Sequence, residues 1–591
     1  MKFKKFTIHY SLFIILLILF SFWAVRPLFH PGFFPIHDDT QVVRVFQMAK
    51  ALSDGQFPVR WVDGLGYGFG YPIYNFYAPL AYYIGALFNL VGFNALLATK
   101  LMMILGVLLS GVFMYFLARE FWGEIGGVIS ALFYVYAPYH AVDIYVRGAV
   151  AEFWAMAFLP LAFLAIYKIF ECKRTPEVSG GHPRRLISWL ILGTLSFAAV
   201  ILSHNLTAMM AIPFIFLLIL AMIIFSKNKK LLITNYLLLI TFTLSFSAFY
   251  WLPALAEMKV TKVFGQIGGE ADFRDHFVLL DQLWASPWGF GGSAPGRLDG
   301  MSFMIGKLHL ILAVFSVFTS FFFWRRKKIQ SLATLFAACC LLLAVFFTNR
   351  LSQSIWELIP PLAFVQYPWR FLVFASFAVS FMAGLVAKIP PPTMRLKFRL
   401  LLGWWDIFGG TIIILALLFL NTKYFQPQFY FDVSAADYTN EENIKWKTSK
   451  ISDEYLPKDF PVPTRKNEVA WEKIAILRGE AEISNLVLKS HRYTFEVIAK
   501  TDTEILLNTA YFPGWQVWVD GKKTNFSLNN GKIKLSLFAG SHQVLTRFAN
   551  TPARTLANLV SLVSWLGATG FLLRRRCCRL KWREFRKSNL C

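Results

Sequence analysis

Long apolar runs dominate the pattern of hydrophobic and polar positions in this chain. A helix needs roughly 20 apolar residues to cross a bilayer. Twelve runs approach that length, at 6–25, 95–117, 124–138, 153–170, 187–203, 207–225, 231–252, 306–324, 330–348, 370–387, 400–420 and 553–573. No A-x-A-like cleavage site follows the first run, so we interpret it as a retained signal anchor. The pattern predicts an α-helical polytopic membrane protein with about twelve transmembrane helices.

A thirteenth apolar stretch, residues 71–91, decides the topology. It contains two prolines, two asparagines and five tyrosines, which favour an interfacial position. If residues 71–91 do not span, every strong basic cluster lies on the same side of the membrane as Lys2, Lys4 and Lys5. Those clusters contain Arg119, Lys173, Arg174, Arg184, Arg185, Lys227, Lys229, Lys230, Arg325 to Lys328, Lys388, Arg395, Lys397 and Arg399. The positive-inside rule then predicts a multi-pass plasma-membrane protein with both termini cytoplasmic.

This topology divides the chain into three parts. They are a transmembrane domain at 1–420 with outer segments 26–94, 139–152 and 253–305, an extracytoplasmic β-rich domain at 421–551, and a last helix with a basic tail at 552–591. The β-rich domain shows period-2 strands joined by Asp-Gly, Asn-Gly and Ala-Gly turns. The strands are expected at 480–488, 493–499, 504–510, 515–519, 522–528, 532–538 and 543–548. We interpret the domain as a sandwich in which Trp515 and Trp518 are core residues rather than a sugar platform.

Composition agrees with a membrane protein. The 591 residues are 56% hydrophobic and only 16% charged, against about 25% charged in soluble domains. The net charge of +25 comes from short clusters between apolar runs, so no nucleic-acid surface is predicted. The basic stretch 574–587 favours anionic lipid headgroups. None of the six cysteines lies in an outer segment, so no disulfide is expected. Cys577 and Cys578 are either acylated or ordinary thiols.

An acidic pair follows the first span directly, in the order His37-Asp38-Asp39-Thr40. Carboxylates at a membrane boundary are costly and often functional. The next residues, 40–52, have helical amphipathic spacing and suit a helix on the membrane surface. Asp39 or Thr40 could cap that helix. The pair is therefore either a helix cap or part of a site.

Other polar residues cluster at the predicted outer ends of spans. Asp143, Arg147 and Glu152 form either an internal ion pair or a ligand contact. Arg370, beside Tyr367, either reaches a lipid headgroup or binds a specific phosphate through its planar fork.

Three further features lie in these outer segments. His204-Asn205 follows the fifth span, where a histidine is either a satisfied interfacial residue or a ligand. The glycines between residues 64 and 70 are expected to give a surface loop its backbone freedom, because no nucleotide-binding turn surrounds them. The segment 253–305, rich in glycine and aromatic residues, is either a mobile lid or a static loop.

This organisation resembles the GT-C membrane glycosyltransferases. Short motifs more closely resemble bacterial membrane proteins with a "6-pyruvoyl-tetrahydropterin synthase-related" domain and a neighbouring lipoteichoic-acid glycosylation group. The motifs are Tyr71-Pro-Ile-Tyr, Ala78-Pro-Leu-Ala-Tyr-Tyr, Arg147-Gly-Ala, Ser203-His-Asn, Gln366-Tyr-Pro-Trp-Arg and Tyr511-Phe-Pro-Gly-Trp. No three-histidine zinc arrangement supports pterin chemistry.

The resemblance implies an inverting transfer of sugar from a polyprenyl-phosphate donor to an extracytoplasmic cell-envelope acceptor. Asp38 or Asp39 would be the general base. Arg370, Arg147, His204 and Tyr367 would bind the donor, and His37, Asp143, Glu152 and Asn205 the substrate. Some GT-C members use a divalent cation such as Mg or Mn, but Asp38 and Asp39 are adjacent rather than D-x-D spaced, which leaves metal binding open. The alternative is a non-enzymatic transporter or scaffold for lipid-linked polymers; a transporter would place charges at mid-membrane, whereas here they crowd at the outer ends.

Overall fold

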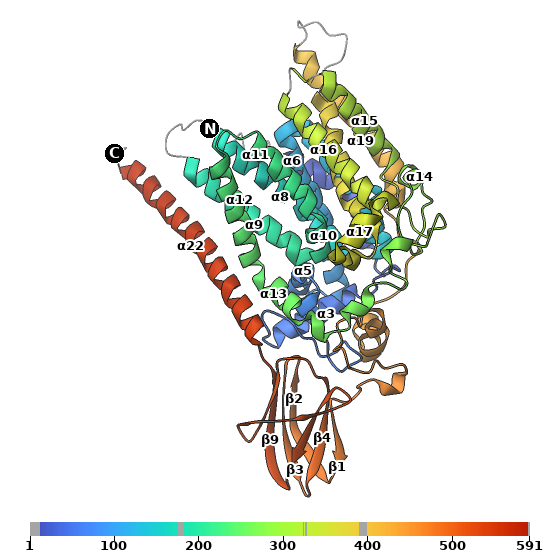
Figure 1. Cartoon of the computed structure of the whole chain (residues 1–591), viewed down its shortest axis with the longest axis vertical. Coiled ribbons are helices and arrows are strands. Elements are labelled where there is room, and N and C mark those ends of the chain that lie inside the picture. The colour runs from blue at the N-terminus through green and yellow to red at the C-terminus, as the bar shows by residue number, and fades with distance from the viewer. Residues whose placement is uncertain (1–11, 175–181, 323, 326–327, 389–398, 589–591) are drawn as a thin grey trace.

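The computed structural model describes the whole chain except residues 1–11, 175–181, 323, 326–327, 389–398 and 589–591. A bundle of helices stands on a β sandwich, and the last helix, α22, runs back along the bundle (Figure 1). The predicted fold class, a mainly helical protein with several apolar helices and a C-terminal β region, is confirmed. Lys2, Lys4, Lys5 and the 395–397 cluster lie outside the described residues, as do the side chains of the 574–587 tail.

Helices occupy the described parts of all twelve predicted apolar segments. They are α2 (Phe22–Val25), preceded by helical residues 12–20, α6 (Ala95–Val135), α8 (Val150–Arg174), α9 (His182–Ser203), α10 (Asn205–Met210), α11 (Ile212–Ile224), α12 (Lys229–Phe246), α13 (Ala248–Glu257), α15 (Lys307–Phe322), α16 (Lys328–Thr348), α18 (Leu372–Ala383), α19 (Arg399–Asn421) and α22 (Pro552–Ser588). In the described residues, 7 helices are long and apolar enough to span, or up to 8 if one bent pair counts as a span. The count of twelve therefore stays a prediction.

Two predicted spans lie in α6, on either side of a kink. The helix covers 95–117 and, as far as Val135, most of 124–138, and the kink between them is at Gly123, with φ 73° and ψ −173°. The stretch 71–91 forms α4 (Ile73–Phe76) and α5 (Leu80–Leu90). Eleven residues of helix are about 16 Å long, roughly half the hydrocarbon thickness. A helix of this length agrees with a segment that does not span.

The predicted amphipathic helix is present as α3 (Gln41–Ser53), but it is not a surface helix. Its polar residues Gln41, Arg44 and Gln47 are only 1%, 4% and 2% exposed. Arg44 donates to Ser452 at 2.9 Å and lies over the Tyr77 ring at 4.3 Å. The polar face of α3 is thus covered by a distant part of the chain, which the local pattern could not show.

The glycine series is also buried, contrary to the surface loop we expected. Gly68 and Gly70 have φ of +78° and +87°. A Cβ at Gly68 would lie 2.6 Å from the Ala470 carbonyl oxygen, and one at Gly70 would lie 2.3 Å from the Trp61 ring. Gly68 therefore allows Lys445 and Ala470 to pack closely over the segment, and Gly70 leaves room for the Trp61 ring.

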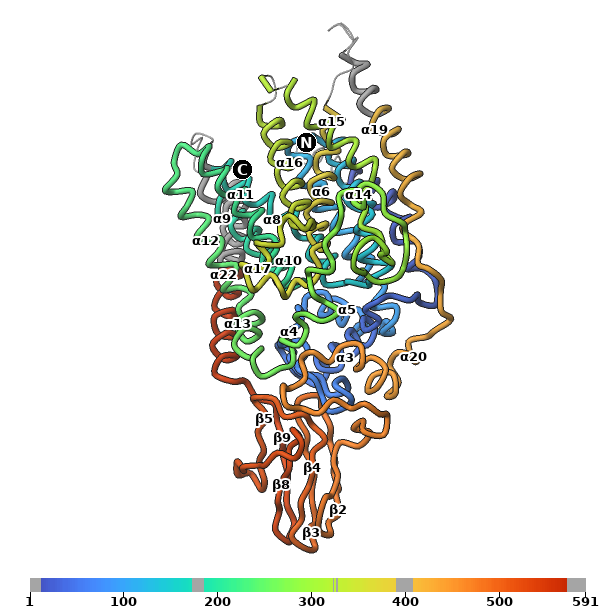
Figure 2. The backbone as a smooth tube through the Cα atoms, turned by 45° about the vertical axis from the view of Figure 1, so that its right-hand side comes forward, coloured from blue at the N-terminus to red at the C-terminus, as the bar shows by residue number. Residues whose placement is uncertain are grey.

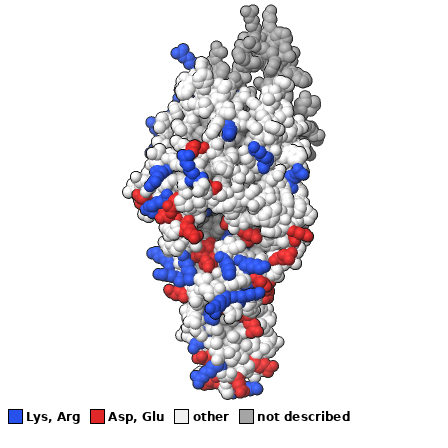
Figure 3. Space-filling model, turned by 90° about the vertical axis from the view of Figure 1, so that its right-hand side faces the viewer, with Lys and Arg blue, Asp and Glu red and all other residues white. Residues whose placement is uncertain are grey.

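The β region begins later than the predicted boundary at 421. Residues 421–473 form short helices, including α20 (Ala435–Thr439) and α21 (Ser449–Ile451), and lie between the bundle and the sheets (Figure 2). They contact segment 26–94, in which the hydroxyls of Tyr67 and Tyr71 donate to the carboxylates of Asp453 and Glu454, both at 3.3 Å. In the face shown in Figure 3, charged side chains gather over the middle and the sheet end of the molecule.

Within the described ranges, nine strands form two antiparallel sheets, with the orders β1-β4-β8-β7 and β2-β3-β9-β5-β6. Their bounds are β1 Ile474–Arg478, β2 Ala481–Lys489, β3 Arg492–Ala499, β4 Thr503–Ala510, β5 Trp515–Val519, β6 Lys522–Thr524, β7 Ser527–Asn529, β8 Lys532–Leu537 and β9 Gly540–Phe548. The predicted strand 522–528 is split between both sheets, and β1 was not predicted. Trp515 is buried at 3% exposure, as expected of a core residue, and Trp518 is half-buried.

Candidate active site

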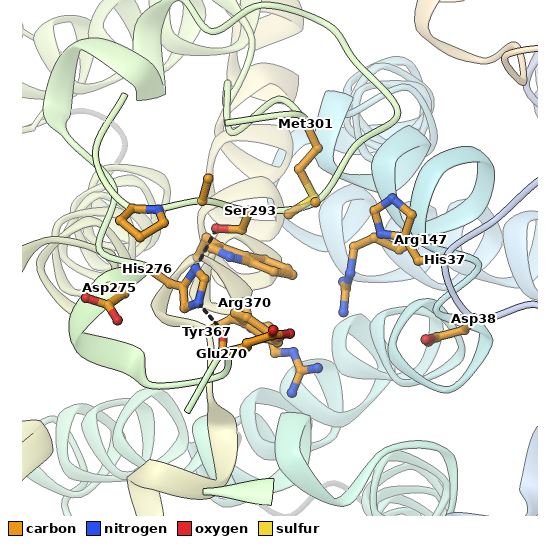
Figure 4. A pocket seen from close by; sticks show the side chains of 14 residues that line it. His37, Asp38, Arg147, Glu270, Asp275, His276, Ser293, Met301, Tyr367 and Arg370 are labelled. Carbon is orange, nitrogen blue, oxygen red and sulfur yellow. Dashed lines mark hydrogen bonds between the residues drawn. The ribbon is translucent and has the colours of Figure 1, made fainter. Parts of the chain in front are cut away.

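A cavity of about 540 Å³ lies where the loop segments 26–94, 139–152 and 253–305 meet the residues before α18. Its walls are His37, Asp38, Arg147, Glu270, Asp275, His276, Gly292 to Pro295, Met301, Tyr367, Trp369 and Arg370. In Figure 4 the guanidinium groups of Arg147 and Arg370 point into the space between Asp38 on one side and His276 with Glu270 on the other. Residues as far apart in the sequence as His37 and Arg370, separated by 333 positions, thus line one cavity.

Backbone hydrogen bonds place Asp38 beside Arg147. The amides of His37 and Asp38 donate to the carbonyls of Val146 and Arg147 at 3.0 and 2.9 Å. The Gln41 amide, buried at the start of α3, donates to the Asp38 carbonyl at 3.2 Å and to the Gly148 carbonyl at 2.8 Å. The two loops therefore form one rigid unit.

Arg147 ends a π-helical turn, η2 (Val142–Arg147). Gly148 has φ +65°, and a Cβ there would lie 2.5 Å from Ile36, so the turn requires glycine. The Arg147 guanidinium binds Asp143 and, at 3.0 Å, Glu152, and it lies 4.5 Å above the Trp369 ring. Both carboxylates are buried, and they orient the guanidinium, which points into the cavity.

Arg370 comes from the opposite wall, in the short 3-10 helix η8 (Pro368–Phe371). It donates to the Val365 carbonyl at 2.9 Å and lies 5.2 Å from the Tyr367 ring, which stacks on Trp369. The Glu152 carboxylate is 3.8 Å from Nε, beyond hydrogen-bond distance, and Nε has no hydrogen-bond partner. Arg370 is thus fixed in place by a carbonyl and aromatic packing, with most of its donor fork unused.

The part of the cavity wall that segment 253–305 contributes was not predicted from the sequence. His276 bonds to the Ser293 hydroxyl and the Glu270 carbonyl, both at 2.9 Å, and packs edge-on against Tyr367 at 4.8 Å. Since a carbonyl can only accept, His276 Nε2 donates to Glu270, while the Ser293 hydroxyl beside Nδ1 also donates to the Asp299 carboxylate at 3.3 Å. The only signal in the sequence was a histidine among several acidic residues within a glycine-rich loop.

The two members of the acidic pair have different surroundings. Asp38 lines the cavity, whereas Asp39 does not. Asp39 Oδ1 is buried without a hydrogen-bond partner, and burial raises the pKa of this carboxyl to about 6. Thr40 is the N-cap residue of α3, but its side chain makes no capping bond, so neither residue caps as we expected.

His204 and Asn205 lie away from the cavity lining. His204 Nδ1 caps α10 by accepting from the Thr207 amide at 3.3 Å. Burial lowers the pKa of His204 to about 3 although the Glu152 carboxylate opposes this, so the imidazole is neutral. Asn205 is exposed and accepts from the amide of Leu206 at 3.0 Å. Within the part of the chain that the structure describes, no group of three or more His, Cys, Asp or Glu could hold a metal ion.

Residues 74–267, which include Arg147 and Glu152, match the family model of the 6-pyruvoyl-tetrahydropterin synthase related domain, described as a membrane protein. The predicted resemblance is confirmed. An uncharacterised protein of Lactococcus lactis subsp. cremoris is 25% identical over 268 residues, which cover 44% of this chain and 41% of that protein. The match therefore spans less than half of the relative.

Three solved structures are similar at lower sequence identity. For the oligosaccharyltransferase of Archaeoglobus fulgidus the TM-score is 0.48 at 11% identity, covering 77% of this chain and 60% of that one. For ArnT of Cupriavidus metallidurans bound to undecaprenyl phosphate it is 0.40 at 11% identity, covering 75% and 77%. For the mycobacterial arabinofuranosyltransferase AftD it is 0.41 at 15% identity, covering 72% and 27%.

Proposed function

We propose that this protein is an inverting membrane glycosyltransferase that moves a sugar from a polyprenyl-phosphate donor to an extracytoplasmic cell-envelope acceptor. The observation that carries the proposal is the arrangement of Asp38, Arg147 and Arg370 around one cavity, with a carboxylate on one side and two guanidinium groups facing it. Glycosyl transfer needs both a base for the nucleophile and cations for the leaving phosphate.

Asp38 is the general base in this proposal. Its carboxylate takes the proton of an acceptor hydroxyl as that oxygen bonds to the anomeric carbon of the sugar. The bond from that carbon to the phosphate oxygen breaks, and the lipid phosphate leaves with the electron pair. A single displacement of this kind inverts the anomeric configuration. Asp39 is set aside because it lies outside the cavity lining.

The leaving phosphate needs positive charge that is already in position. Arg370 can offer two parallel charge-assisted hydrogen bonds, because only one of its donors is taken by the Val365 carbonyl. Arg147 adds a second cation, oriented by Asp143, Glu152 and the Trp369 ring. Tyr367 and His37 line the same space and can contact the sugar. Asp143 and Glu152 then act as positioning residues, and His204 contributes a neutral imidazole near Glu152.

Two neighbouring substitutions test the base. Asp38→Asn preserves size but removes basicity, and the loss of a general base is typically worth about 10²–10⁴-fold in rate. Asp39→Asn is the matched control, since it makes the same change one residue away and outside the cavity. Transfer from a synthetic polyprenyl-phosphate sugar by purified protein should fall by that factor only for Asp38→Asn. Equal activity of both variants would remove Asp38 from the site, and no transfer by the unaltered protein with any such donor would favour the transporter or scaffold.

A further inference from the structure

A second, larger cavity lies inside the helix bundle and takes no part in the site above. Its volume is about 920 Å³, and it lies between α6, α8, α11, α16 and α18. Two aromatic pairs form its back wall. The ring centroids of Phe163 and Phe377 are 4.9 Å apart, and those of Phe121 and Phe381 are 5.4 Å apart. A cavity of this size and lining suits the hydrocarbon of a lipid better than a polar solute.

Part of the rim of the cavity is exposed apolar surface. Phe225 of its rim is 55% exposed and Ile329 is 43% exposed, and Cys339 is exposed on the same helix as Ile329. Large apolar side chains are left exposed in this way where lipid covers them. The rim residues belong to α11 and α16 and to the turn after α11, at the end of the bundle remote from the β strands (Figure 1).

One end of the cavity is basic. Lys227, just after α11, and Lys328, the first residue of α16, line it together with Ser226 and Gln330. Neither lysine takes part in the ion pairs found among the described residues. The nearby carboxylates of Glu120 and Glu171 are bound instead to the buried Lys168. The two ammonium groups therefore stand at the mouth of an apolar cavity without an acidic partner from the described chain.

We propose that this cavity binds an anionic two-chain phospholipid, with its phosphate between Lys227 and Lys328 and its acyl chains along the aromatic wall. Basic pockets between membrane helices recognise anionic headgroups in this way. The lysine end belongs to the predicted cytoplasmic side, so the lipid comes from the inner leaflet. It is separate from the proposed polyprenyl-phosphate donor, whose phosphate would lie by Arg370 at the other end of α18.

Native mass spectrometry of the full-length protein tests this site without any transfer assay, so its outcome is independent of the proposed function. Detergent-purified protein is titrated with phosphatidylglycerol or phosphatidylcholine. We expect phosphatidylglycerol to bind more tightly, and Lys227→Gln/Lys328→Gln to weaken its binding about thirtyfold while leaving phosphatidylcholine binding unchanged, because each lysine contributes roughly fivefold.

Two further variants keep the test decisive. Lys229→Gln/Lys230→Gln removes the same charge from exposed neighbours outside the cavity lining and should retain binding. Ala333→Trp fills the cavity and should displace the lipid, while circular dichroism shows that the helices are intact. The proposal is overturned if both lysine pairs weaken binding equally, if phosphatidylcholine binds as tightly, or if the protein retains a polyprenyl phosphate there instead.

Discussion

The backbone amide of Asp38 donates to the backbone carbonyl of Arg147 at 2.9 Å. This bond joins the proposed base to one of the proposed phosphate-binding residues through the main chain, although 109 positions separate them in the sequence. The backbone segments that carry the proposed base and the guanidinium are therefore held side by side. Such preorganisation lets the two groups act on one bond without rearrangement.

Gln41 should be a positioning residue for this pair. Its side-chain amide is 1% exposed, donates to the carbonyls of Asp38 and Gly148, and accepts from Tyr82 at 2.7 Å. Gln41→Glu removes both donors and turns a carboxylate towards two carbonyl oxygens. A misplacement of about 1 Å can cost about 10²-fold in rate. We expect kcat for glycosyl transfer to fall by about that factor, with a smaller change in KM.

Gln47→Glu is the matched control for this prediction. Gln47 is equally buried on the same helix, but its oxygen accepts from the Gly64 amide at 3.3 Å, away from the cavity. That acceptor survives the substitution. If Gln47→Glu lowers kcat as much as Gln41→Glu does, general disturbance of α3 explains both results.

Arg370→Lys should weaken use of the lipid-phosphate donor by about 10- to 100-fold, the worth of one lost charge-assisted hydrogen bond. Lysine keeps the charge but cannot present two parallel donors. The measurement is kcat/KM with a synthetic polyprenyl-phosphate sugar, with expression level as a check on folding. Arg350→Lys is the control, because Arg350 lies at the same end of the bundle and, among the described residues, its side chain bonds only to Gln353 at 3.2 Å. Unchanged kcat/KM for Arg370→Lys would indicate an arginine that merely reaches the lipid headgroups.

The helix pattern and most of the strands could be predicted from the sequence because both depend on local periodicity. The cavity could be predicted only in part. Asp38, Arg147 and Arg370 could be predicted because they are charged residues near the ends of apolar runs. His276 lies within a long loop, where no neighbouring span indicates its position. The burial of Arg44 depends on Ser452, about 400 residues away, and no local pattern encodes that contact. The different surroundings of Asp38 and Asp39 likewise arise only when distant loops pack.

Asp39 should make stability fall as pH rises. Burial raises the pKa of its carboxyl to about 6 in the folded protein, against about 3.9 in an unfolded chain. The folded state therefore binds this proton more tightly, and the resulting stability is present below about pH 4 and lost as pH rises through 6. The contribution is on the order of 3 kcal/mol. Asp39→Asn has no proton to lose there, so its thermal midpoint in detergent should fall less than that of the unaltered protein between pH 4.5 and 7.

Asp38→Asn checks this prediction in the same scan, because Asp39 keeps its carboxyl and the pH dependence should remain. If the thermal midpoint of Asp39→Asn changes between pH 4.5 and 7 as much as that of the unaltered protein, groups other than Asp39 cause the pH dependence.

The predicted topology can be tested by labelling engineered thiols from outside the cell. In a variant without the six native cysteines, Lys522→Cys on strand β6 and Lys230→Cys near the start of α12 both place a thiol at an exposed position. The one-sided basic clusters predict that only the first reacts with a membrane-impermeant reagent on intact cells. Both should react after the membrane is permeabilised, which controls for accessibility. The reverse pattern on intact cells would place the β sandwich and the proposed active site in the cytoplasm, where an extracytoplasmic acceptor could not reach Asp38.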